Sequence, residues 1–96
     1  MRVRFTPSAR RELLEALDFI RQDSPTAADD VLARAAKELE RLRNFPESGR
    51  VVPEFPDLPY REVLANPYRF FYRIIDDAVW VVAVWHDRQI PESPEA

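Results

Sequence analysis

The sequence predicts an α+β domain in which an N-terminal strand precedes an antiparallel two-helix hairpin, and the hairpin covers one face of a small antiparallel sheet. Two observations lead to this fold class. The first half of the chain repeats apolar residues every three or four positions, whereas the second half contains strand-like segments separated by short turns. The resulting order of strand, helix, helix, strand, strand, strand is typical of helices packed on one side of a sheet.

The N-terminal half provides one strand and both helices. Residues 2–5 alternate charged and apolar side chains, which predicts a short strand. Thr6-Pro7 and Ser24-Pro25 each combine a capping residue with proline at the first helical position, and they predict helices over about 7–22 and 25–43. Because the link between the helices is short, we expect them to pack as an antiparallel hairpin.

The C-terminal half provides the rest of the sheet. Residues 44–59 are rich in proline and contain the only glycine, so they predict a loop. Three strands are expected at 60–64, 68–75 and 78–86, joined by turns at 65–67 and 76–77. Residues 90–96 are expected to form a disordered tail. The whole chain, 1–96, is expected to be a single domain.

Turns of these lengths assign the side chains of the sheet to two faces. The helix-facing core is expected to contain Leu13, Leu17, Leu32, Leu39, Phe70 and Tyr72. The same register places one carboxylate, Glu62, awkwardly on this face. The opposite face collects Arg61, Val63, Arg69, Phe71, Arg73, Trp80, Val82, Val84 and His86, with Arg88 just beyond. A one-residue slip in either turn would exchange the two faces.

No helix is left to cover the second face, which mixes cationic and apolar side chains. We therefore expect it to bind a partner such as an acidic or amphipathic peptide or a phosphate backbone. The expected contact residues are Arg61, Arg69, Phe71, Arg73, Trp80 and Arg88.

The composition restricts the chemistry that this face can perform. The chain carries a net charge of −3 at pH 7, so a bulk electrostatic grip on nucleic acid is not expected. It contains no cysteine and one histidine, so we expect no disulfide, no metal and no cofactor. No segment resembles a signal peptide or is long enough to span a membrane, which predicts a cytoplasmic protein.

The arginines of this face permit two interpretations. In the structural one, Arg73 stacks on Trp80, while Arg61 and Arg69 pair with nearby acids such as Glu54 or Asp57. In the catalytic one, the face belongs to a metal-independent ribonuclease, which needs cations at the phosphate and a group that transfers protons. The residues available for these catalytic roles are Arg61, Arg69, His86 and Arg88.

Five segments carry a family resemblance: FTPSARRELLEAL, NFPESGRVVPE, YREV, NPYRFFYRI and VWVVAVWHDRQ. In their order and spacing they resemble the RelE/ParE family of bacterial toxins from type II toxin–antitoxin systems. The resemblance covers about residues 3–89 of the chain. It implies a toxin neutralised by a cognate antitoxin, whose gene we expect to be adjacent and whose flexible C-terminal part wraps the toxin.

The resemblance implies two alternative mechanisms. RelE-like members cut mRNA on the ribosome with basic side chains of the sheet, whereas ParE-like members act on DNA gyrase and lack that nuclease set. Arg69 matches the family's sheet arginine, and Arg61 stands where RelE-like enzymes have a first catalytic lysine. His86 and Arg88 match the basic end of the last strand.

Two departures from the RelE-like pattern favour a ParE-like toxin that acts on gyrase. Val63 occupies the position of a second catalytic lysine, and no Tyr or Phe follows Arg88. A ribosome-dependent mRNA endonuclease is the first alternative. A non-toxic binding module that keeps only the contact with the antitoxin is the second.

Overall fold

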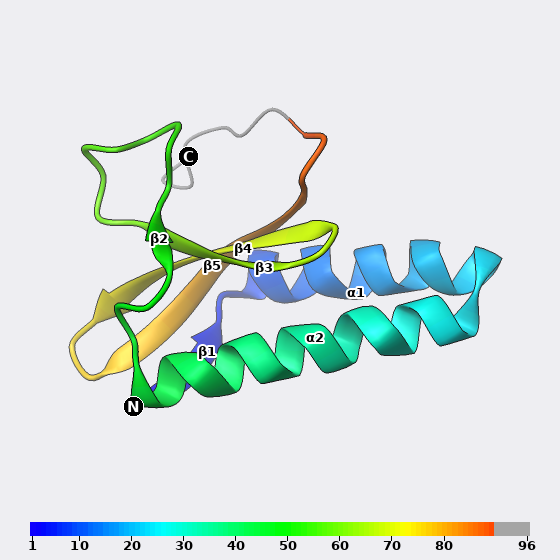
Figure 1. Ribbon diagram of the computed structural model, residues 1–96, viewed down its shortest axis with the longest axis horizontal. Coiled ribbons are helices and arrows are strands. Elements are labelled where there is room, and N and C mark those ends of the chain that lie inside the picture. Colours follow the sequence, from blue (N-terminus) through cyan, green and yellow to red (C-terminus); the bar gives the residue numbers. More distant parts are fainter. Residues whose placement is uncertain (90–96) are drawn as a thin grey trace.

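The computed structural model describes residues 1–89, and the predicted disordered tail at 90–96 lies outside the described residues. Two helices lie side by side on one face of a five-stranded sheet (Figure 1). The elements in chain order are β1 (Arg2–Phe5), α1 (Pro7–Asp23), α2 (Pro25–Asn44), β2 (Arg50–Val51), β3 (Arg61–Ala65), β4 (Tyr68–Ile75) and β5 (Ala78–His86). The predicted α+β fold class is confirmed.

Both helices begin where the sequence predicts. The hydroxyl of Thr6 accepts a hydrogen bond from the Ala9 N–H at 3.2 Å, and the hydroxyl of Ser24 accepts one from the Ala27 N–H at 3.1 Å. These caps satisfy N–H groups that a helix start otherwise leaves without a partner. The inner faces of the two helices pack on the sheet and form the larger hydrophobic core.

The strand order is β1-β5-β4-β3-β2. The pairs β5–β4, β4–β3 and β3–β2 are antiparallel, as expected, but β1 runs parallel to β5, so the sheet is mixed. The parallel pair is possible because the helical hairpin lies between β1 and the rest of the sheet in the chain. Short β2 is an additional strand within the segment predicted to be a loop.

The predicted register of β3 against β4 is wrong by one residue. Ala65 pairs with Tyr68, so the turn contains two residues rather than three. Every side chain of β3 therefore changes face. Val63 is buried in the helix-facing core, Leu64 is exposed, and Glu62 lies opposite Phe71 on the other face, which removes the predicted burial of a carboxylate against the helices.

The predicted register of β4 against β5 is correct at the turn and wrong beyond it. Arg73 pairs with Trp80, as expected. An irregularity between Phe71 and Tyr72 then shifts the pairing, so that Phe71 lies opposite Ala83 and Arg69 opposite Trp85. Consequently the side chains at the end of β5 point to the faces opposite to those predicted. Val84 lies in the helix-facing core, and Trp85 packs on the other side of the sheet.

The face without helices is covered by the loop 52–60. The sequence predicted a loop in this region but not that it covers the sheet. This loop lies on the side of the sheet opposite the helices (Figure 1). Val52 and Tyr60 pack on Phe71 and Ala83 in a second hydrophobic core, with Phe55 and Leu58 at its margin. Phe71 is 0% exposed and Arg69 is 6% exposed, so the expectation that both belong to an uncovered surface is wrong.

The larger core provides a test of the helix packing with a matched pair of leucines on α2. Leu42 is 0% exposed, whereas Leu32, which the sequence predicted to be in the core, is 44% exposed. We expect Leu42→Ala to lower the free energy of unfolding by about 2–5 kcal/mol, because it leaves a cavity. Leu32→Ala is expected to change it by less than about 1 kcal/mol. Denaturant melts measure both, and equal effects would contradict this packing.

Candidate functional site

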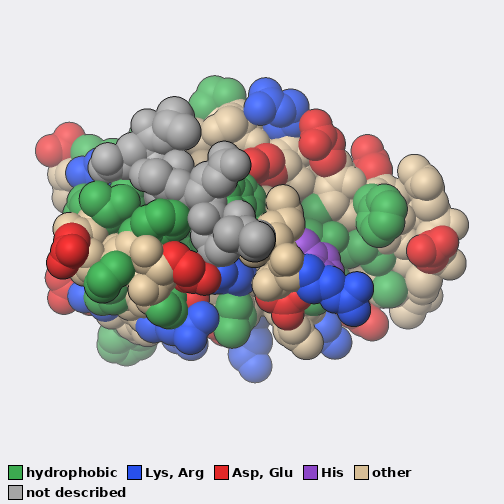
Figure 2. Space-filling view, turned by 90° about the horizontal axis from the view of Figure 1, so that it is seen from above, with side chains coloured by type: hydrophobic (Ala, Val, Ile, Leu, Met, Phe, Trp, Pro, Cys, Tyr) green, Lys and Arg blue, Asp and Glu red, His purple; other side chains and the backbone are tan. Residues whose placement is uncertain are grey.

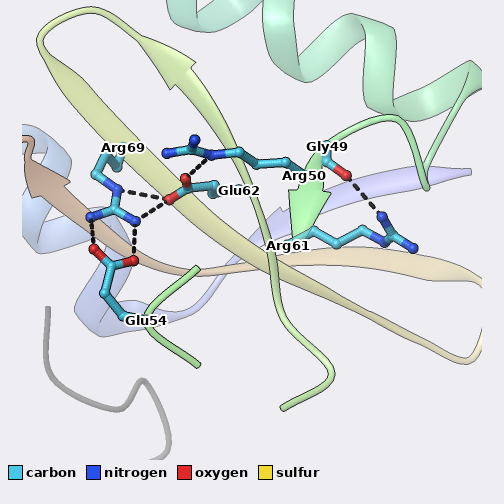
Figure 3. Close-up of polar contacts among 6 residues, drawn as sticks. All are labelled: Gly49, Arg50, Glu54, Arg61, Glu62 and Arg69. Carbon is cyan, nitrogen blue, oxygen red and sulfur yellow. Dashed lines mark hydrogen bonds and ion pairs between the residues drawn. The ribbon is translucent and has the colours of Figure 1, made fainter. Parts of the chain in front are cut away.

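Ion pairs join four charged side chains of the sheet and the loop 52–60, namely Arg50, Glu54, Glu62 and Arg69 (Figure 3). The centre of this cluster is Arg69 on β4. The two terminal nitrogens of Arg69 donate to both carboxylate oxygens of Glu54, at 2.9 and 2.7 Å. Its Nε donates to Oε1 of Glu62 at 2.7 Å. Arg69 is thus bidentate to a loop carboxylate and also bonded to a sheet carboxylate, which is the strongest geometry available to a guanidinium.

Glu62 links this cluster to the edge of the sheet. Its side chain is completely buried, and its second oxygen accepts a hydrogen bond from the Nε of Arg50 on β2. A carboxylate buried to this extent is stable only when cations and hydrogen bonds compensate it. Arg50 and Arg69 supply that compensation from opposite sides. The guanidinium of Arg69 also lies 4.9 Å from the ring centre of Phe71, which adds a cation–π contact.

The hydrogen bonds of the cluster shift two pKa values in the direction that favours the charged forms. The hydrogen bond from Arg69 lowers the pKa of Glu54 against the opposing effect of burial. The hydrogen bond to Glu54 raises the pKa of Arg69, with a further contribution from Glu62. Both groups therefore remain ionised and paired at neutral pH.

A second polar arrangement surrounds the only glycine. Gly49 donates its N–H to the hydroxyl of Tyr72 at 3.0 Å, and that hydroxyl donates to the carbonyl of Pro46 at 2.7 Å. Arg61 donates to the Gly49 carbonyl at 2.9 Å. In Figure 3, Arg61 points toward Gly49 and away from Glu62 and Arg69. Burial raises the pKa of Tyr72 and favours the neutral hydroxyl that these bonds require.

Arg73 and Trp80 are adjacent across the strands but do not stack on each other. The guanidinium of Arg73 lies 5.5 Å from the ring centre of Tyr60, and that of Arg4 on β1 lies 5.9 Å from the ring centre of Trp80. The expected stacking of Arg73 on Trp80 is therefore corrected: the loop brings Tyr60 to Arg73, and the parallel pairing of β1 brings Arg4 to Trp80.

His86 lies on the helix-facing side of β5. Its ring meets Tyr68 edge-on with 5.3 Å between the ring centres, and its Nδ1 accepts a hydrogen bond from the Arg88 N–H at 3.0 Å. The free edge of β5 nearby is closed by Glu12 of α1, which accepts from the Val84 N–H and from the indole nitrogen of Trp85, both at 3.1 Å. This contact was not expected from the sequence.

The structure does not bring the four predicted catalytic residues together. Arg69 lies beneath the loop, Arg61 bonds to Gly49, His86 faces the helices, and Arg88 follows the end of β5. The predicted pairing of Arg69 with Glu54 is present, whereas the role of Glu62 was missed. Its misfit on the helix-facing side was the signal that could have identified it.

Figure 2 shows the molecule from the side of the loop, where acidic and basic side chains are intermingled. Within residues 1–89 there is no group of three histidine or acidic side chains placed to hold a metal ion. In the same part of the chain, neither helix combines the length and the hydropathy needed to cross a bilayer.

Comparison with known proteins gives the class of this chain. Residues 3–91 match the family model described as the ParE toxin of the type II toxin–antitoxin system parDE. A Sinorhizobium fredii protein named "Putative toxin Y4kP" is 38% identical over 89 residues, which are 92% of this chain and 90% of that protein. This chain belongs to the ParE family of type II toxin–antitoxin toxins.

One solved structure shares the fold at low sequence identity. It is titled "Chromosomal ParDE TA system from P. aeruginosa" and superimposes with a TM-score of 0.71 at 14% identity, over 90% of this chain and 95% of that one. The arrangement of a helical hairpin on one sheet face is therefore preserved where the sequences have diverged widely.

The bond between Glu54 and Arg69 predicts a pH-dependent contribution to stability. At pH 7 we expect Glu54→Gln to lower the free energy of unfolding by about 1 kcal/mol, since solvent screens the exposed part of Glu54. Because folding lowers the pKa of Glu54, the advantage of the wild type should shrink as the pH falls below about 4.3, where the unfolded carboxylate takes up a proton. Asp57→Asn in the same loop is the control. A difference independent of pH would contradict the ion pair.

The surroundings of Gly49 predict that no side chain fits there. A Cβ at this position would lie 2.5 Å from the Tyr72 hydroxyl and 2.7 Å from the backbone oxygen of Glu62. We expect Gly49→Ala to lower the free energy of unfolding by about 1–3 kcal/mol, the usual cost of overpacking. Thermal and urea melts measure this effect. An unchanged stability would show that the loop after α2 can move away from Tyr72.

Proposed function

We propose that this chain is a growth-inhibiting toxin that acts on DNA gyrase and is neutralised by an antitoxin encoded by the adjacent gene. The choice of gyrase over mRNA as the target rests on the burial and the ion pairing of Arg69. A RelE-like nuclease would use this arginine on phosphate, but here it is buried and compensated by Glu54 and Glu62. The two carboxylates cancel most of the positive potential of this guanidinium, so it would stabilise the charge of a phosphate only weakly.

Two further placements support a toxin without nuclease chemistry. Val63, which stands at the position of a second catalytic lysine, is 3% exposed in the helix-facing core. His86 lies on the side of the sheet opposite the loop-covered cluster, so it is poorly placed to exchange protons at a phosphate held near Arg69. A gyrase inhibitor acts in the cytoplasm, which is where we place this chain.

We expect the antitoxin to contact those of the predicted residues that remain accessible. Of the expected contact residues, Arg69 and Phe71 are buried, which leaves Arg61, Arg73, Trp80 and Arg88. An acidic stretch of a flexible antitoxin would complement these arginines, and disordered segments commonly fold onto a partner as a helix in a groove or as an added strand.

Controlled expression in a bacterial host tests the function. We expect growth arrest with SOS induction and altered plasmid supercoiling, and we expect co-expression of the adjacent gene to restore growth. Primer extension on translated messages should show no codon-phased cuts. A plasmid with an early stop codon in the reading frame is the matched control.

Two results would overturn the proposal. Codon-phased mRNA cuts would make the chain a ribosome-dependent endonuclease. Unaffected growth, together with a stable complex with the adjacent gene product, would make it a non-toxic binding module.

A further inference from the structure

A cleft of about 330 Å³ lies between the loop and the C-terminal half of β4. Its walls combine apolar, aromatic and charged side chains: Glu47, Val51, Pro56, Leu58, Pro59, Tyr60, Arg61, Tyr72, Arg73 and Ile74. The size is at the low end of clefts that bind small molecules or single side chains. Two of the proposed antitoxin contacts, Arg61 and Arg73, line this cleft, which narrows the contact to a definite place on the sheet.

One side of the cleft is a free strand edge. β3 begins at Arg61, whose partner on β4 is Tyr72, so within residues 1–89 the segment 73–75 pairs only with β5. On the other side its backbone groups have no strand partner in this part of the chain. A strand edge of this kind accepts an extended peptide, which pairs through its main chain and places alternate side chains toward the sheet.

The two arginines of the cleft have no carboxylate partner among residues 1–89. The Nε of Arg73 is buried and forms no hydrogen bond with the described residues. Arg61 bonds to the Gly49 carbonyl. This differs from Arg50 and Arg69, which are both paired with Glu62. Because neither guanidinium is neutralised by a carboxylate within residues 1–89, a ligand carboxylate in the cleft would supply the missing opposite charge.

We propose that this cleft binds an extended acidic peptide segment, in which a Glu or Asp carboxylate meets Arg73 and Arg61 and a neighbouring apolar side chain contacts Leu58, Pro59 and Ile74. The proposal rests on the proposed function only for the source of the segment, which would be the antitoxin. A peptide is favoured over a phosphate backbone because the walls are largely apolar and the chain carries a net charge of −3.

Glu47 allows a test in which one substitution strengthens binding of the acidic ligand while others weaken it. This carboxylate also lines the cleft and would repel the carboxylate of the ligand. Removing its charge should therefore strengthen binding, whereas removing the charge of Arg73 or Arg61 should weaken it.

The test is an NMR titration of the chain with the capped dipeptide acetyl-Leu-Glu-amide, with neutral acetyl-Leu-Gln-amide as the matched ligand. We expect amide shifts concentrated at residues 60–61 and 72–75. Arg73→Gln and Arg61→Gln should each weaken binding about tenfold, the effect of losing one charge-assisted hydrogen bond, and Arg73→Lys should weaken it less. Glu47→Gln should strengthen binding, and Arg21→Gln on α1 should leave it unchanged. Circular dichroism checks that each variant is folded.

Several outcomes would overturn the site. They are absent binding, equal binding of the neutral dipeptide, shifts elsewhere, or no effect of Arg73→Gln in a folded variant. Tighter binding of inorganic phosphate than of the acidic dipeptide would make the cleft a phosphate site instead.

The adjacent gene product separates this inference from the proposed function. Dipeptide binding at the cleft without a complex between the two full proteins would refute the antitoxin partnership and leave the site standing. A complex that forms with equal affinity in the wild type and in Arg73→Gln would refute the cleft as an antitoxin anchor and leave the partnership standing.

Discussion

The organisation of the loop-covered side depends on the ion pair between Arg69 and Glu54. Arg69 and Glu62 are both buried on the sheet, and Glu54 comes from the loop. A buried cation destabilises a fold unless carboxylates compensate it, so the pairing with Arg69 favours the loop position that places Glu54 beside it. With the loop fixed there, Val52 and Tyr60 reach Phe71 and complete the second core. A charge cluster thus determines the position of an apolar cover.

The two faces of the sheet are buried by different means. Helices provide a regular apolar surface for one face, while the other is closed by a proline-rich loop with little regular structure of its own. Such a loop needs specific attachments because few repeated backbone bonds hold it. The attachment at its start is the contact of Gly49 with the Tyr72 hydroxyl, and the attachment further along is Glu54 on Arg69. Both depend on side chains of β4.

Four arginines of strands β2, β3 and β4 in this ParE-family chain divide into two pairs with different consequences for function. Arg50 and Arg69 are compensated within the fold and stabilise it. Arg61 and Arg73 have no carboxylate partner in the described part of the chain and lie at a cleft beside a free strand edge. A positive charge can act on another molecule only where the fold has not already neutralised it. The fold therefore neutralises Arg69 and leaves Arg61 and Arg73 without a compensating carboxylate in the described part of the chain.

The sequence by itself determined the elements, because caps, helical periodicity and strand alternation are local signals. Thr6 and Ser24 mark the helix starts, and β4 and β5 have the predicted bounds. It also identified Glu54 as a candidate partner of Arg69. Only the tertiary structure decided which face each strand residue occupies. A two-residue turn before Tyr68 and an irregularity after Phe71 each reverse side-chain direction. Which register forms depends on how both faces of the sheet pack against the helices and the loop, and strand alternation alone does not encode this packing.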